Sequence, residues 1–211
     1  MNPCRIAIMA KAPVAGLAKT RLAPALGEAG AAALAARLLA HAVVQAVAAD
    51  LGTVTLWATP DASHPAFTQA QRQHGVVLAV QSGGDLGARM AQVFEDGFAQ
   101  AGSPILLMGT DAPGLDAALL RQAAATLQSH AAVFVPAHDG GYALVGLRAA
   151  PPGLLSALFG SMRWSTPQVM AQTRERLAAA GITHAELQSV ADIDEPADLQ
   201  HLQHLQHLQR A

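Results

Sequence analysis

A carboxylate lies just beyond a short run of large apolar residues, at a position typical of a cation ligand. The run Ile105–Met108 follows Pro104, and Gly109 and Asp111 come directly after it. Ligands of open α/β sheets bind beyond the carboxyl ends of buried strands, so Asp111 is placed to hold a divalent cation or a substrate hydroxyl. The alternative is that Asp111 only stabilises the turn at Pro113 or the start of the next helix.

Three cations follow the first predicted strand. Lys11, Lys19 and Arg21 lie within a stretch of eleven residues, in a chain with 13 Lys and Arg residues in all. The loop between them contains Gly16, and its backbone N–H groups together with these cations suit a diphosphate. The loop is not a Walker A motif, because Ala18 precedes Lys19 where that motif requires glycine. A solvated basic loop is the alternative.

Three further residues are candidates for contacts with a nucleotide or a sugar. Asp85 follows Gly84 at the start of a predicted helix, where its carboxylate could equally bind a ligand or cap the helix. Arg89 lies one turn later and opposes the helix dipole, which indicates a nearby anion. Trp164, in the polar loop 161–167, is either a stacking surface or a core residue.

Two more acidic segments follow later in the chain. Asp139 begins a tight Asp-Gly-Gly turn after the predicted strand 132–136, and it either serves that turn alone or faces a ligand. The segment 192–198 contains four acids in seven residues, beginning with Asp192 and Asp194. Four carboxylates this close repel one another, so the cluster favours a bound cation.

Alternating apolar runs and helical patterns predict the elements that must position these residues. The reversal between two of the later strands is short, which predicts an antiparallel pair and therefore a mixed sheet. The pattern as a whole indicates an α/β fold with a mostly parallel sheet. Strands are expected at 5–10, 53–58, 76–80, 105–108, 132–136, 142–147 and 183–190, and helices at 28–50, within 60–75, and at 85–101, 115–129, 167–180 and from 196 onward.

Composition restricts the class of protein. At 211 residues the chain fits one domain, and a net charge of −2 gives no electrostatic footprint for nucleic acid or an anionic membrane. Cys4 is the single cysteine, which excludes an internal disulfide and a cysteine-rich zinc site. We find no apolar stretch of about 18 residues and no signal sequence, so we expect a cytoplasmic protein.

The last residues form a low-complexity segment. Leu, Gln and His repeat with a period of three, so each leucine is rotated by about 300° from the previous one on a helix. A leucine stripe that moves around the helix in this way cannot stay buried along the whole segment. We predict one domain over residues 1–199 and a helical tail over 200–211.

These motifs together resemble the DUF2064 family of bacterial GT-A-type glycosyltransferases, some of which are linked to arsenosugar biosynthesis. The resemblance covers almost the whole chain. It implies a Rossmann-like GT-A fold, a three-layer sandwich with a mostly parallel mixed sheet, in which a nucleotide half and an acceptor half share one domain. The motifs lie at 11–22, 84–90, 109–113, 139–147 and 192–199.

The resemblance also implies a divalent cation, Mg²⁺ or Mn²⁺, that bridges a nucleotide diphosphate. Asp111 matches the position of the metal-binding acid in that family. However, Thr110-Asp111-Ala112 is not the Asp-x-Asp motif that many GT-A enzymes carry. The second carboxylate must therefore come from elsewhere, and we choose Asp192 or Asp194.

We therefore expect a metal-dependent glycosyltransferase that moves a sugar from a nucleotide-diphosphate sugar to a small acceptor. Nucleotidyl transfer from a nucleoside triphosphate to a phosphorylated acceptor is the alternative, since the wider nucleotide-diphospho-sugar transferase superfamily also includes nucleotidyltransferases. A non-catalytic nucleotide-binding protein is a third hypothesis. The chain is also a candidate homodimer. The expected roles are metal binding by Asp111, Asp192 and Asp194, nucleotide or diphosphate binding by Lys11, Gly16, Lys19, Arg21, Arg89 and Thr110, and proton abstraction by Asp139 or, second, Asp85.

Overall fold

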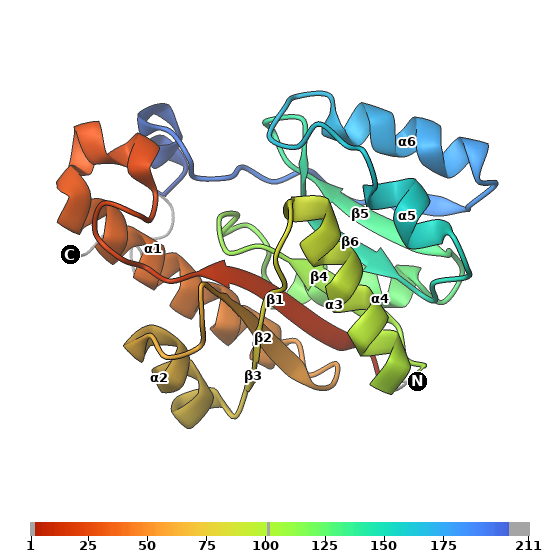
Figure 1. Cartoon of the computed structure of the whole chain (residues 1–211), viewed down its shortest axis with the longest axis horizontal. Coiled ribbons are helices and arrows are strands. Elements are labelled where there is room, and N and C mark those ends of the chain that lie inside the picture. The colour runs from red at the N-terminus through yellow and green to blue at the C-terminus, as the bar shows by residue number, and fades with distance from the viewer. Residues whose placement is uncertain (1–2, 101, 203–211) are drawn as a thin grey trace.

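A computed structural model describes residues 3–100 and 102–202, and its strands and helices alternate along most of the chain. Seven strands form one sheet in the order β3-β2-β1-β4-β6-β5-β7. Figure 1 shows this sheet between two groups of helices. The elements are β1 (Arg5–Lys11), η1 (Thr20–Leu22), α1 (Ala23–Ala48), β2 (Val54–Thr59), α2 (Pro65–His74), β3 (Val77–Val80), α3 (Leu86–Gln100), β4 (Ile105–Met108), α4 (Ala117–Thr126), β5 (Ala132–Pro136), β6 (Tyr142–Leu147), α5 (Leu154–Phe159), α6 (Val169–Ala179), β7 (His184–Glu186) and η2 (Pro196–Leu202).

The sheet is mostly parallel, as predicted. β1 pairs in parallel with β2 and β4, β2 pairs in parallel with β3, and β5 pairs in parallel with β7. β6 is antiparallel to both of its neighbours, β4 and β5. The reason is the short connection 137–141, which is too short for a crossover and returns the chain beside β5. The prediction of a mixed sheet is confirmed.

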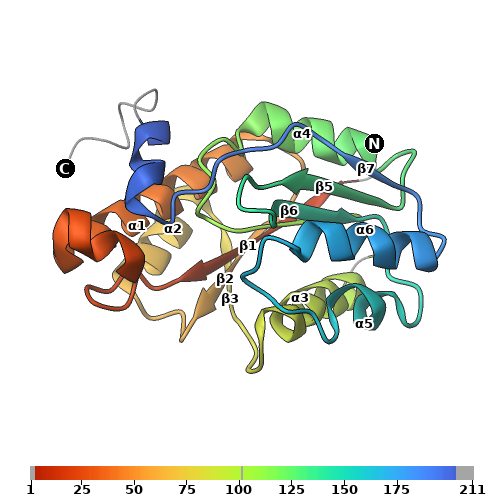
Figure 2. The same ribbon diagram turned by 90° about the horizontal axis from the view of Figure 1, so that it is seen from above.

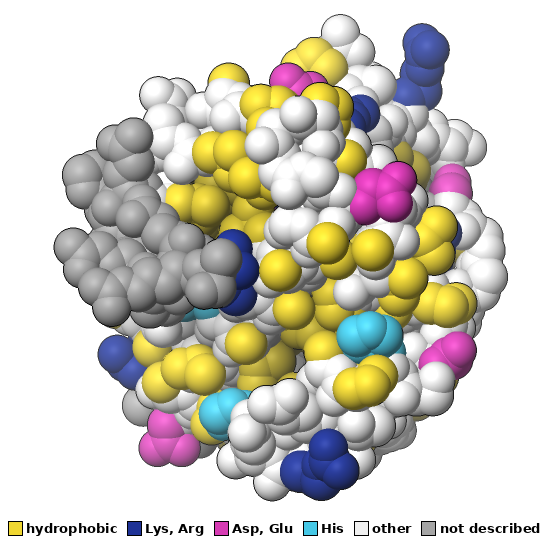
Figure 3. Space-filling view, turned by 90° about the vertical axis from the view of Figure 1, so that its left-hand side faces the viewer, with side chains coloured by type: hydrophobic (Ala, Val, Ile, Leu, Met, Phe, Trp, Pro, Cys, Tyr) yellow, Lys and Arg dark blue, Asp and Glu magenta, His cyan; other side chains and the backbone are white. Residues whose placement is uncertain are grey.

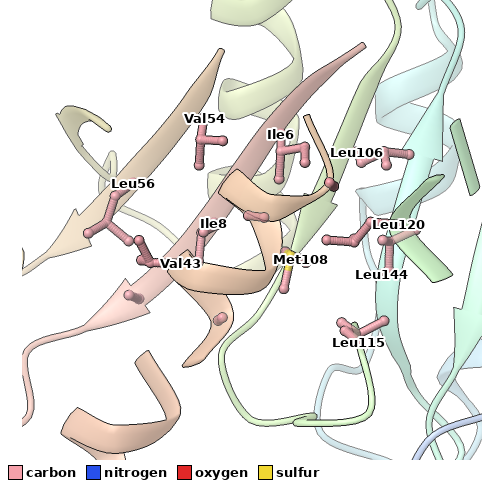
Figure 4. Packing of buried hydrophobic residues seen from close by; sticks show 14 of the residues in the cluster. Ile6, Ile8, Val43, Val54, Leu56, Leu106, Met108, Leu115, Leu120 and Leu144 are labelled. Carbon is pink, nitrogen blue, oxygen red and sulfur yellow. The ribbon is translucent and has the colours of Figure 1, made fainter. Parts of the chain in front are cut away.

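Two helical layers cover the sheet because successive residues of its buried strands point to opposite faces. In β1, Ile6 and Ile8 pack in the cluster with α1, α2 and α4, whereas Ala7 packs in the cluster with α3, α5 and α6. Figure 2 shows these helices on opposite sides of the strands. Figure 4 shows Leu106 and Met108 of β4 in the first cluster, near Leu120 of α4 and Leu144 of β6. The expected three-layer sandwich is therefore confirmed.

One prediction about the helix that follows the first loop, α1, must be corrected. The expectation that no apolar stretch is long enough to span a membrane is wrong, because Thr20–Ala48 spans 29 residues and reaches a mean hydropathy of 1.6. Gly27, at φ 71° and ψ 163°, interrupts this helix with non-helical backbone. Beyond it, Leu34, Leu38 and Val43 are buried against the rest of the domain. Alanine supplies much of the hydropathy, and one face of α1 packs against the core while the remainder stays at the surface.

The C-terminal part of the chain differs most from the sequence prediction. The strand expected over 183–190 is reduced to β7, and the terminal helix is the 3-10 helix η2. The short helix α5 was not predicted, since its six residues between Gly153 and Gly160 contain too few turns to display a helical period. Residues 203–211, which contain most of the predicted tail, lie outside the described part of the chain.

Charged side chains are dispersed over the face of the molecule shown in Figure 3. Lys and Arg side chains on that face are separated by hydrophobic and uncharged groups. A concentrated field of one sign needs like charges to gather, as in a cleft or along a stripe. This face therefore presents small, separate charges.

A bidentate ion pair joins α6 to β7. Arg174 donates from Nε and Nη2 to the two carboxylate oxygens of Glu186, at 2.6 and 2.7 Å. These hydrogen bonds hold the pKa of the Glu186 carboxyl below its usual value. A lowered folded-state pKa stabilises the protein above the unfolded pKa of Glu, and this contribution is lost as the pH falls through the folded pKa.

We accordingly expect Glu186→Gln to lower the free energy of unfolding by about 0.5–1 kcal/mol at pH 7, since Arg174 is partly exposed and solvent screens the pair. The difference from wild type should vanish in acid, below the lowered pKa. Urea unfolding at several pH values measures it. The exposed Glu175 offers a matched control, Glu175→Gln, which should show no such pH-dependent loss. A constant difference at all pH values would contradict the ion-pair explanation.

Candidate active site

A cavity of about 750 Å³ opens at the carboxyl ends of β1 and β4. The strand order reverses here, because β2 and β3 lie on one side of β1 while β4 and the later strands lie on the other. Loops diverge at such a switch point and leave room for a ligand. Residues from 9–11, 17–21, 107–112, 137–145, 164–169 and 192–194 contribute to the lining.

Most of the predicted site residues line this one cavity, although they come from distant parts of the sequence. Gly16 and Asp85 are the exceptions among them. The predicted residues in the lining are Lys11, Lys19, Arg21, Arg89, Thr110, Asp111, Asp139, Asp192 and Asp194.

Lys19 is the centre of the charged part of the cavity. Its Nζ lies 2.5 Å from Asp111 Oδ1 and 2.7 Å from Asp194 Oδ1, and it donates to the carbonyl oxygen of Ile193 at 2.6 Å. Its side chain is only 7% exposed, whereas those of Asp111 and Asp194 are 49% and 43% exposed. A buried ammonium thus joins two carboxylates that remain open to the solvent.

The charge of Lys19 is secured by these partners. Burial by itself lowers the pKa of a lysine, because the charged form loses its hydration. Here the charges and hydrogen bonds of Asp111 and Asp194 outweigh burial and raise the pKa of Lys19 above its ordinary value. The cavity therefore contains a permanent positive charge between two negative ones.

A buried isoleucine brings the two carboxylates together across the sequence. Ile193 donates its backbone N–H to the carbonyl oxygen of Asp111 at 2.9 Å, which fixes the C-terminal segment beside the loop after β4. The Ile193 side chain is fully buried against Leu22 and Leu38. Figures 1 and 2 show this segment beside the first half of α1. With residue 193 pointing into the core, Asp194 is directed to the cavity.

The acidic segment is also ordered by its own hydrogen bonds. Asp198 Oδ2 accepts the backbone N–H groups of Asp194 and Glu195, at 3.0 and 2.7 Å, just before η2. A carboxylate at this position satisfies donors that the start of a helix leaves unpaired. Asp198, one of the four acids of the predicted cation-binding cluster, thus has a structural role.

The first loop is arranged differently from the simple set of converging cations expected. Lys11 Nζ donates to the carbonyl oxygen of Leu17 at 2.8 Å, so this lysine closes the loop. Gly16 adopts a φ of 74° in the turn, a backbone conformation that glycine adopts more easily than other residues. Arg21 is 66% exposed and lies 3.7 Å from Glu195. Its guanidinium is therefore available to an incoming anion.

Asp139 and Asp192 form a second acidic group in the cavity. Asp139 Oδ1 accepts the backbone N–H of Gly141 at 2.8 Å, which positions its carboxylate in the turn between β5 and β6. Burial, followed by the charge of Asp139, raises the pKa of Asp192. Asp192 therefore lies within the field of Asp139 and, to a smaller extent, of Asp194 and Asp198. Asp194 also shares Lys19 with Asp111.

Three predicted residues remain: Asp85 and Arg89 at the start of α3, and Thr110 after β4. The Asp85 carboxylate accepts the N–H of Ala88 at 2.8 Å, which is the N-cap interaction considered from the sequence. Arg89 does line the cavity, and its Nε donates to the carbonyl oxygen of Gly84 at 3.0 Å. Thr110 also lines the cavity and donates from its hydroxyl to Asp111 Oδ1 at 3.4 Å.

Two aromatic residues, Tyr142 and Trp164, also line the cavity. Tyr142 lies in the lining, and burial raises the pKa of its hydroxyl. Tyr142 was not among the predicted site residues, although it directly follows the Asp-Gly-Gly turn. Trp164 packs against the core beside Phe159 and also lines the cavity, and its use as a stacking surface stays a prediction. Its buried Nε1 has no hydrogen-bond partner within the described residues.

Comparison with known proteins supports the assignment from the motifs. The chain is similar to a Desulfovibrio desulfuricans protein assigned as a nucleotide-diphospho-sugar transferase, at 31% identity and a TM-score of 0.84 over 96% of this chain and 87% of the other. The same fold occurs in a nucleotidyl transferase from Methanothermobacter, at 12% identity and a TM-score of 0.65 over 97% and 98% of the two chains. It also occurs in the Mycobacterium tuberculosis protein Rv0371C in complex with manganese, at 16% identity and a TM-score of 0.57 over 95% and 97%.

A search of the curated proteins gave no match. Among protein families, the one described as "Uncharacterized protein conserved in bacteria (DUF2064)" matches residues 34–166. This range contains the strand before Asp111 and the turn at Asp139, and the whole-chain similarity to the Desulfovibrio protein adds the first loop and the acidic C-terminal segment. On these grounds the chain belongs to the DUF2064 family and has the Rossmann-like fold of the nucleotide-diphospho-sugar transferases.

Proposed function

We propose that this protein is a metal-dependent glycosyltransferase that transfers a sugar from a nucleotide-diphosphate sugar to a small-molecule acceptor. The observation that carries the proposal is the convergence of Lys19, Asp111 and Asp194 in one cavity at the strand switch point. A diphosphate leaving group needs its negative charge neutralised, and fixed charges in a partly enclosed site supply this. The similarity to a nucleotide-diphospho-sugar transferase agrees with a nucleotide substrate and a transfer reaction.

Two of the carboxylates suit Mg²⁺ or Mn²⁺. Across residues 3–100 and 102–202, no three His, Cys, Asp or Glu side chains are grouped as metal ligands. Asp111 and Asp194 nevertheless direct one hard oxygen each to a common point, which suits a cation that also takes phosphate and water oxygens. We assign these two residues as the metal ligands and place Asp192 with Asp139. When bound, the cation supplies charge stabilisation at the diphosphate.

The remaining charged residues have distinct proposed roles. Lys19 and Arg21 bind diphosphate oxygens, and Arg89 faces them from the start of α3. Asp139 accepts the proton of the acceptor hydroxyl, since it lies in the cavity while Asp85 is engaged as an N-cap. Tyr142 and Trp164 would shape the part of the cavity that excludes water from the acceptor.

Nucleotidyl transfer is the second candidate function. One observation favours it: the chain shares its fold, over nearly its full length, with a nucleotidyl transferase from Methanothermobacter. In that reaction an acceptor phosphate attacks the α-phosphate of a nucleoside triphosphate, and pyrophosphate leaves. The same cations and carboxylates would stabilise the same kind of charge.

The two reactions are distinguished by their products. The purified protein is incubated with nucleotide sugars and with nucleoside triphosphates, each with and without Mn²⁺ and with a panel of small acceptors. We expect release of a nucleoside diphosphate from one nucleotide sugar, dependent on Mn²⁺. Pyrophosphate release from a triphosphate would instead establish the second function. The proposal includes a cytoplasmic location, in which such nucleotides are plentiful.

A further inference from the structure

The geometry of Lys19 points to a gate on the cation site, an inference that rests on the proposed function. We propose that the Lys19 ammonium occupies the cation position between Asp111 and Asp194, and that the diphosphate of the substrate must draw it away before a divalent cation binds. Metal binding would then depend on nucleotide binding.

Every hydrogen-bond donor of the Lys19 ammonium already has an acceptor. Its three N–H groups match three acceptors within 2.7 Å, namely Asp111 Oδ1, Asp194 Oδ1 and the carbonyl oxygen of Ile193. The same two carboxylate oxygens are the ones that a divalent cation would take. Mg²⁺ binds oxygen at about 2.1 Å, so a metal ion and the ammonium cannot both occupy this position.

The second support is the anchoring of the loop that carries Lys19. The neighbouring side chains of Ala18 and Leu22 are buried, and Lys19 itself adopts a left-handed backbone conformation with φ 49°. Leu22 packs beside Ile193, the residue that holds the acidic segment. The backbone therefore presents Lys19 to the two carboxylates, and a change of partner requires a movement of its side chain within the cavity.

The third support is the distribution of exposure. Lys19 is nearly buried, while Asp111 and Asp194 are each more than two-fifths exposed on the cavity side. A phosphate oxygen that enters the cavity can thus reach the Lys19 ammonium from the open side of the cavity, where Arg21 is also exposed. A diphosphate offers Lys19 an anionic partner, and transfer of the ammonium to it would leave two unneutralised carboxylates that attract a divalent cation.

Direct measurement of Mn²⁺ binding to the nucleotide-free protein tests this gate. Free Mn²⁺ is monitored by electron paramagnetic resonance for wild type, Lys19→Met and the double variant Lys19→Met/Asp111→Asn. We expect Lys19→Met to bind Mn²⁺ about tenfold more tightly than wild type or better, since the carboxylates lose their internal cation, and the double variant to lose this gain. Lys11→Met is the matched control, because Lys11 lines the same cavity but its Nζ donates to the backbone carbonyl of Leu17.

Several outcomes would overturn the proposal. They are equal Mn²⁺ affinity of wild type and Lys19→Met, an equal gain in Lys11→Met, or retention of the gain in the double variant. Circular dichroism confirms that each variant is folded, and Lys19→Gln replaces Lys19→Met if the latter is not. None of these readouts requires turnover, so failure of the gate and failure of the proposed glycosyl transfer are separately visible.

The coupling itself is measured through the nucleotide. The affinities for UDP, GDP, ADP and CDP are determined with and without Mn²⁺. For the nucleotide that binds, we expect Mn²⁺ to strengthen binding in wild type and to do so several-fold less in Lys19→Met, where no ammonium has to move. Asp111→Asn lacks one of the two proposed metal ligands, so an effect of Mn²⁺ that persists in this variant measures the chelation of Mn²⁺ by nucleotide in solution. An equal effect of Mn²⁺ in wild type and Lys19→Met would refute the gate.

Discussion

Asp111→Asn is expected to reduce turnover by about 10³-fold or more, equivalent to roughly 4 kcal/mol of transition-state stabilisation. The substitution keeps the size of the side chain and removes its charge. The site then loses one of the two carboxylates on Lys19 and one of the two proposed metal ligands. Initial rates of nucleoside diphosphate release, measured over a range of Mn²⁺ concentrations, provide the comparison with wild type.

Stability measurements separate this loss of activity from a loss of structure. Because the Asp111 side chain is 49% exposed, we expect its substitution to lower the free energy of unfolding by only about 1 kcal/mol. Asp116→Asn is the matched control. Asp116 lies outside the large cavity and caps α4 through the N–H of Leu119, a role that asparagine fills equally well. Full activity in Asp111→Asn would refute both assigned roles of this residue.

Gly140→Ala is expected to be the most destabilising of the substitutions considered. Gly140 has a φ of 91°, and a Cβ there would lie 2.2 Å from the carbonyl oxygen of Pro167. The Gly140 carbonyl oxygen also accepts the N–H of Met170 at 2.9 Å, so the turn and the start of α6 are packed together. Relief of the contact requires a backbone shift, and we expect a cost of about 3 kcal/mol or more.

For a domain of this length, that cost corresponds to a fall in Tm of roughly 6–12 °C. Gly153→Ala is the matched control, since Gly153 has a φ of 84° and nothing lies within 4 Å of its added Cβ. We expect that variant to lose about 1 kcal/mol, from backbone strain alone. Thermal unfolding followed by circular dichroism measures both. Equal Tm values for the two variants would mean that the contact with Pro167 does not constrain the turn.

Activity should fall together with stability in Gly140→Ala, even well below its Tm. The same turn positions Asp139, whose carboxylate accepts the N–H of Gly141. A shifted turn moves the proposed base relative to the cavity, and such displacements reduce rates steeply. Comparison with Gly153→Ala at a common temperature isolates this effect.

The sequence alone determined the fold class and most of the elements. Buried strands such as Ile105–Met108 are short and continuous in hydrophobicity, and the short reversal at 137–141 permits only an antiparallel neighbour. These are local signals, which depend on adjacent residues. Where the local signal was weak, the prediction was incomplete, as for α5 and for the short strand β7.

Only the tertiary structure decided how the candidate residues are paired. The sequence left Asp192 and Asp194 as equal partners for Asp111. The structure joins Asp194 to Asp111 through Lys19, while Asp192 lies in the field of Asp139 and, to a smaller extent, of Asp194 and Asp198. It also assigned Asp85 to a helix cap. Pairings of this kind depend on contacts such as that of Ile193 with Asp111, between residues far apart in the chain. Spacing in a sequence records which groups follow one another, whereas charge neutralisation depends on which groups meet in space.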